Sequence, residues 1–76
     1  MGNSFSKVWI ESGILYLKSD KEVEAVEIYS ANGICIWNEC INNRIWELVT
    51  SKLSRGLLLV KVTTIDGNQE TFKLSN

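Results

Sequence analysis

The sequence predicts an all-β domain: a small antiparallel β-sandwich of six to seven strands, immunoglobulin-like, or else a small barrel. Short runs of β-branched and other apolar residues recur along the 76 residues, and turn residues separate them at close intervals. No proline interrupts these runs, and no segment has the sustained period of a clear helix. Each sheet must bury one face, so we expect the strands to pack around a single core.

The first hairpin is expected near the N-terminus. Residues 7–10 (KVWI) and 13–18 (GILYLK) are short β-rich runs, and Gly13 permits a tight reversal between them. The mixed-charge residues 19–22 (SDKE) are typical of a solvated loop. Residues 1–6 are expected to be disordered or to derive from an added Met-Gly start, which leaves residues 7–76 as one sandwich domain.

A second hairpin has the stronger turn signal. Residues 24–30 (EAVEIYS) alternate between apolar and polar side chains, as a half-buried strand does. Asn32-Gly33 follows, and both residues tolerate the positive φ that a type I′ turn requires. Residues 34–39 (ICIWNE) should therefore run back antiparallel to residues 24–30.

The C-terminal third repeats this pattern. Residues 57–65 and 68–74 flank an Asp66-Gly67 turn and are expected to form a further hairpin. Residues 43–53 fit both a helical stripe and a strand face. The β-branched and aromatic residues favour a strand that leads into a turn at residues 51–56.

The alternation of these strands predicts which side chains are buried. Each buried Leu, Ile or Val contributes about 1.5 to 3 kcal/mol, which makes a stable core plausible without disulfides. The expected core residues are Leu15, Leu17, Val26, Ile28, Ile36, Leu48, Leu53, Leu58, Val60, Val62, Phe72 and Leu74.

The composition argues against most catalytic and nucleic-acid functions. Eight basic and nine acidic residues give a net charge of -1, without the basic excess of a phosphate-binding surface. The absence of histidine removes the commonest general base and metal ligand, so we expect no enzyme activity, no metal and no cofactor. Cys35 and Cys40 are five positions apart, too far to bridge along one strand; we expect one to be buried and one to lie near a strand end.

The order of signals resembles a known family of sorting domains. Residues 26–33 (VEIYSANG), 48–62 (LVTSKLSRGLLLVKV) and 71–74 (TFKL) are similar to the type A C-terminal sorting domain of type IX secretion cargo proteins in Bacteroidetes. Leu58 departs from the aromatic residue usual at its position, and Val49 from a polar one. The positions that match the family motif are Ile28 and Tyr29 (the I-Y pair), Gly33 (the turn glycine), Leu53 and Gly56 (L-x-x-G), and Lys73 and Leu74 (the last strand).

The resemblance implies a non-enzymatic domain with a seven-stranded sandwich fold. Such a domain directs an attached secreted protein through the periplasm to the cell surface or beyond. Its partners would be the outer-membrane secretion machinery and a sortase-like peptidase, with no nucleic acid and no membrane insertion. We expect a monomer, with residues 69–76 as the recognition strand because a terminal edge strand can pair with a partner chain.

A free-standing extracellular module that binds glycans or mediates adhesion is the alternative. Trp9, Trp37 and Trp46 are many tryptophans for a chain of 76 residues. Trp37 is expected on the same strand face as Cys35 and Glu39, where an aromatic ring could stack on a sugar.

Overall fold

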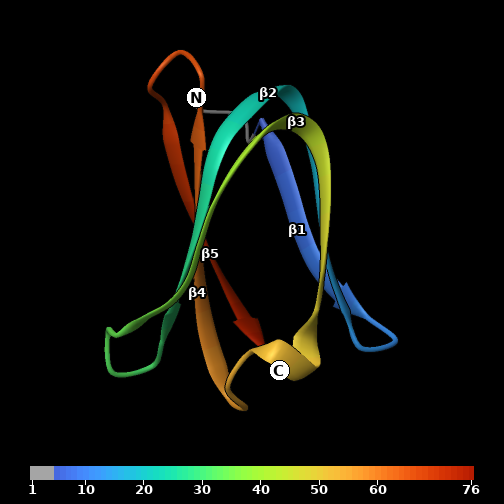
Figure 1. Cartoon of the computed structure of the whole chain (residues 1–76), viewed down its shortest axis with the longest axis vertical. Coiled ribbons are helices and arrows are strands. Elements are labelled where there is room, and N and C mark those ends of the chain that lie inside the picture. The colour runs from blue at the N-terminus through green and yellow to red at the C-terminus, as the bar shows by residue number, and fades with distance from the viewer. Residues whose placement is uncertain (1–4) are drawn as a thin grey trace.

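A computed structural model describes residues 5–76, which form antiparallel strands and one short 3-10 turn, with no α-helix in this part of the chain (Figure 1). The expectation for residues 1–4 lies outside the described residues, and the sheet begins at Ser6, one residue before the predicted domain. The elements are β1 (Ser6–Glu11), β2 (Ile14–Ser30), β3 (Cys35–Val49), η1 (Thr50–Lys52), β4 (Leu57–Thr64) and β5 (Gln69–Ser75).

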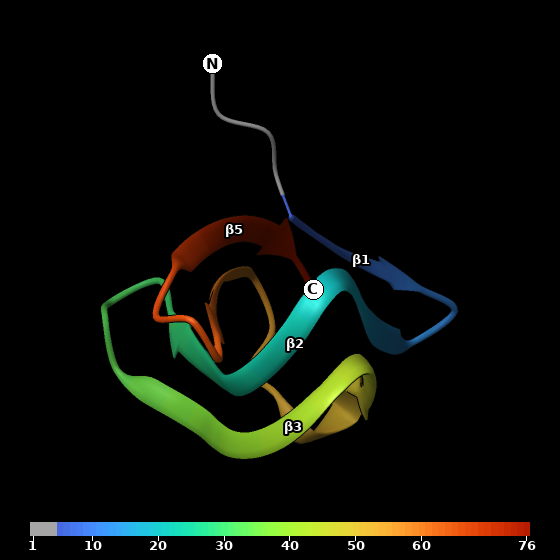
Figure 2. The same cartoon turned by 90° about the horizontal axis from the view of Figure 1, so that it is seen from above.

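The strands form one sheet that curls into a half-barrel (Figure 2). β2 is the central strand and pairs with β3 along one edge. Its other edge is shared: β1 pairs with the first half of β2, from Ile14 to Ser19, and β4 with the second half, from Val23 to Ser30. β5 pairs with β4 and lies beside β1 when the molecule is seen from above.

The described residues form five strands, not the six to seven that were predicted, and the predicted pair of separate facing sheets is not observed. The reason lies at residues 19–22, which continue β2 through a bend instead of forming a solvated loop. The hydroxyl of Ser19 is buried at this bend, where it accepts a hydrogen bond from the amide of Lys21 at 3.1 Å. β3 is likewise continuous across Asn42, whose φ of 47° marks its own bend.

The predicted hairpins form, but the turns at Asn32-Gly33 and Asp66-Gly67 are not the predicted type I′. Ser12 and Gly13, with φ of 52° and 77°, make the type I′ turn that was expected at Asn32-Gly33. At the latter turn only Gly33 has a positive φ, 84°, and its amide donates to the carbonyl of Ser30 at 2.9 Å. This is a three-residue loop with the glycine in the left-handed position, and Gly67 forms the same arrangement after β4.

The core fills the inside of the curl. Most of the predicted core residues are buried, while Ile36, Phe72 and Leu74 are half-buried against them. Two buried hydrophobic residues were not predicted: Val23, because it lies between the predicted loop at residues 19–22 and the predicted strand at residues 24–30, and Trp46, because the pattern around it was ambiguous. The segment around Trp46 is a strand that leads into η1, as predicted.

Candidate functional site

The residues that match the family motif do not converge on one site. Ile28 and Leu53 are buried in the core, with 0% and 7% of their surface exposed. Gly33 and Gly56 are exposed turn residues with φ of 84° and 99°, a region that side chains other than glycine rarely adopt. These four positions therefore have structural roles, two in the core and two in turns.

Tyr29 lies on the opposite face of β2 from Ile28, half-buried between Cys35 of β3 and Leu59 of β4. Desolvation raises the pKa of its phenol, and the nearby carboxylate of Glu27 raises it further. The hydroxyl therefore stays protonated at neutral pH.

Lys73 and Leu74 lie on β5 with opposite orientations, Lys73 exposed and Leu74 half-buried against the core. Gly56 and Asn76 exchange both backbone hydrogen bonds, at 3.0 and 2.8 Å. Bonded and non-bonded pairs alternate along an antiparallel ladder, so the amide and carbonyl of Lys73 point away from β4. They lie on the outer edge of the sheet, where a partner strand could pair with them.

The other end of β5 is covered by the start of the chain. Oε1 of Glu70 accepts hydrogen bonds from the amides of Phe5 and Ser6, at 3.2 and 3.1 Å. This carboxylate closes the seam between β5 and β1. The open part of the β5 edge is therefore the part that contains Lys73.

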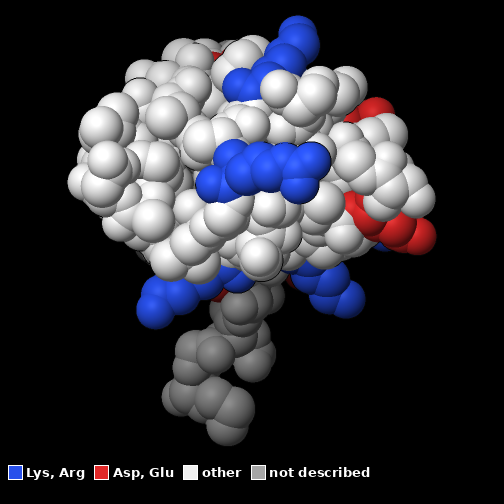
Figure 3. Space-filling model, turned by 90° about the horizontal axis from the view of Figure 1, so that it is seen from below, with Lys and Arg blue, Asp and Glu red and all other residues white. Residues whose placement is uncertain are grey.

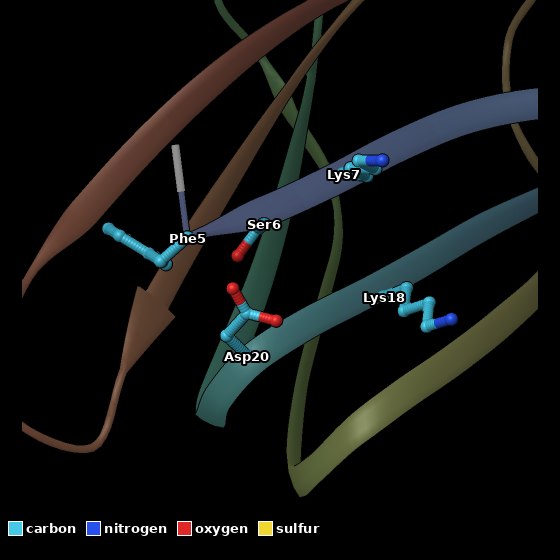
Figure 4. A pocket seen from close by; sticks show the side chains of 5 residues that line it. All are labelled: Phe5, Ser6, Lys7, Lys18 and Asp20. Atoms are coloured by element: carbon cyan, nitrogen blue, oxygen red, sulfur yellow. The ribbon is translucent and has the colours of Figure 1, made fainter. Parts of the chain in front are cut away.

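Two pockets lie on the surface of the described residues. One pocket of about 250 Å³ contains a single carboxylate, Asp20, which points toward Ser6, while Lys7 and Lys18 extend away from it (Figure 4). A second, more open pocket of about 590 Å³ lies between the first hairpin turn and η1 and includes Arg55. Among residues 5–76, no three His, Cys, Asp or Glu side chains gather in a way that could hold a metal ion.

Charge and hydropathy give no further site. Seen from below, basic side chains are spread singly over the surface and acidic ones lie mainly along one flank, so this view contains no continuous basic track (Figure 3). Among residues 5–76, no helix is long and apolar enough to cross a membrane.

The side chain of Trp37 is less exposed to solvent than the sequence suggested. The ring is half-buried, its Nε1 donates to Oε1 of Glu39 at 3.0 Å, and Nζ of Lys52 lies 5.8 Å from its centroid. The expectation of one buried cysteine is wrong: Cys35 and Cys40 are both exposed, and both are free thiols. Cys35 is the first residue of β3, beside an exposed turn, and Cys40 precedes Ile41, which packs against the core, so the Cys40 side chain points to the opposite face.

No protein-family model matches the chain, and no curated protein matches it.

Proposed function

We propose that this chain is a non-enzymatic sorting domain of the type A C-terminal kind, which directs an attached secreted protein across the outer membrane of a Bacteroidetes cell. The observation that carries the proposal is the order of its motifs: the I-Y pair, the turn glycine, L-x-x-G, a long apolar strand and a last strand with lysine. Two further observations support the proposal: the two motif glycines occupy left-handed turn positions, and the motif residues Ile28 and Leu53 are core residues.

The bends in β2 and β3 are compatible with the seven-stranded sandwich of that family. Each bent strand has two segments with different neighbours: the first half of β2 pairs with β1, and its second half with β4. If β2 and β3 are each divided at the bend, the five strands become seven paired segments in two groups. The immunoglobulin-like arrangement remains part of the proposal in this sense.

Recognition by the secretion machinery would use the outer edge of β5. Its N–H and C=O groups at Lys73 are unpaired within the sheet, and addition of a partner strand would pair them. The lysine side chain protects such an edge from unspecific pairing until the correct partner binds.

The test is export of a reporter fused to residues 7–76 in cells that have a type IX system. Lys73→Pro removes one outward amide without breaking the ladder with β4, and it should abolish surface display of the reporter. Lys73→Ala keeps the amide and should retain display. Circular dichroism of both purified variants checks that the sheet is intact.

Deletion of the last six residues should also stop export, because it removes most of β5. Equal display of the reporter with the full domain, with Lys73→Pro and with the deletion would overturn the proposal.

A further inference from the structure

We infer that the outer face of the first half of the sheet binds a second copy of this chain. The face consists of the side chains of β1, β2 and β3 that alternate with core residues and therefore point away from the core. Its three cross-strand rows are Lys7, Lys18 and Ile45; Trp9, Tyr16 and Glu47; and Glu11, Ile14 and Val49. It is called the outer face below.

Much of the outer face is apolar or aromatic, from Trp9 and Tyr16 in the middle row to Ile14, Ile45 and Val49 in the outer rows. The rings of Trp9 and Tyr16 stack with their centroids 5.3 Å apart and an interplanar angle of 21°. Ile45 and Val49 are exposed to 61% and 50% although both are large apolar residues on a strand. A contiguous apolar patch of this kind is typical of an interaction surface, whereas single exposed apolar residues are not.

The charges of the outer face lack partners within the chain. Lys7 and Lys18 are directly opposite each other on neighbouring strands, an arrangement that is destabilising for like charges. The salt bridges among residues 5–76 are elsewhere and join Lys21 to Asp66 and Lys61 to Glu27.

The outer face is complementary to itself. The two lysines occupy one end of the face, while Glu11 and Glu47 occupy the opposite end and one side. A two-fold axis that lies in the interface plane, perpendicular to the strands, places Lys7 of each copy over Glu11 of the other, because these two residues lie at opposite ends of β1. The face is neutral in total, which disfavours an anionic surface such as a membrane or nucleic acid and favours a partner with the same alternating charges.

The dimer is expected to be weak, because nine side chains on each copy bury less than the roughly 800 Å² per partner of a stable interface. We expect a dissociation constant of roughly 10 to 1000 μM. Association replaces the monomer expected from the sequence. The inference goes beyond the proposed function and does not depend on it. The proposed recognition strand is β5, which contributes no side chain to the outer face.

The experiment is sedimentation of the whole chain between about 10 μM and 1 mM. The wild type should shift from monomer to dimer over this range. K7E/K18E makes the outer face wholly acidic, and E11K/E47K makes it wholly basic. For each variant alone, the dissociation constant of the dimer should rise at least tenfold. An equimolar mixture of the two variants should form a heterodimer.

K52E/K73E is the matched control, because it changes the net charge as much as K7E/K18E but leaves the outer face intact. It should dimerise like the wild type. A wild type that stays monomeric at 1 mM, or a mixture that does not restore association, overturns the inference. A monomeric wild type whose tryptophan fluorescence responds to oligosaccharides would assign the outer face to sugars instead.

Discussion

At the scale of single residues, Asp66 organises the turn between β4 and β5. Its carboxylate accepts hydrogen bonds from the hydroxyl of Thr64, from Nζ of Lys21 at 3.1 Å and from the amide of Asn68 at 3.4 Å. The hydrogen bonds from Thr64 and Lys21 lower its pKa from 3.8 to about 2. Because these bonds favour the charged form, the carboxylate stabilises the fold only while it is ionised.

This shift predicts a pH dependence for Asp66→Asn. Asp66 has a lower pKa in the folded chain than in the unfolded one, so its contribution is complete above about pH 4 and is lost as the pH falls through about 2. The wild type should unfold at a higher urea concentration than the variant at pH 6, and the difference should vanish near pH 1.5. A difference that is the same at both pH values would contradict this role.

At the scale of elements, the first hairpin depends on its turn. Gly13 has a φ of 77°, and apart from its chain neighbours no residue has an atom within 4 Å of the position that a Cβ would take, so an added side chain meets backbone strain but no clash. Gly13→Ala should therefore cost about 1 to 2 kcal/mol in the free energy of unfolding, measured in urea. Ser12→Asn is the control, because asparagine tolerates the left-handed region, and it should cost little. If both variants were equally stable, the type I′ geometry would not limit stability.

Prediction from the sequence was most successful for elements whose signal is local. The dipeptides Asn32-Gly33 and Asp66-Gly67 marked their hairpins correctly. In each of them the glycine adopts the positive φ that the turn needs, and this requirement depends only on the few residues of the turn. The predicted loop at residues 19–22 was wrong, because these polar residues look solvated in the sequence. Ser19 is buried there through hydrogen bonds to Phe5 and Ser6, which no local pattern reveals.

At the scale of the whole molecule, contacts between the two ends of the chain close the curl. Glu70 bonds to the amides of Phe5 and Ser6, which precede it by 65 and 64 residues. Nδ2 of Asn76 donates to the carbonyls of Thr50 and Ser54 and ties β5 to η1. The C-terminal strand thus holds both the first strand and the 3-10 turn in place.

Removal of the Glu70 carboxylate tests this closure. Glu70→Ala leaves two amides without their acceptor and should lower the free energy of unfolding by about 1 to 3 kcal/mol. Glu70→Gln keeps a carbonyl acceptor and should lose less. Hydrogen exchange should show that the amides of Phe5 and Ser6 lose protection in the alanine variant, and unchanged protection would argue against the seam.

The candidate site was predictable only where it depends on local sequence signals. Lys73 was placed correctly on an exposed last strand, because strand order and alternation determine that much. The part of the β5 edge that remains open depends on Glu70 and the start of β1, and the outer face depends on which strands pair. Trp9 and Tyr16 had no motif that could have indicated their stacking.

The sequence alone determined the β class, the positions of the hairpin turns and most of the core, because alternation and turn chemistry act over a few residues. Only the tertiary structure decided that β2 and β3 continue through their bends and that the sheet curls until β5 meets β1. Those features depend on burial and hydrogen bonds between residues far apart in the chain, whose free energy outweighs the local preference for a loop.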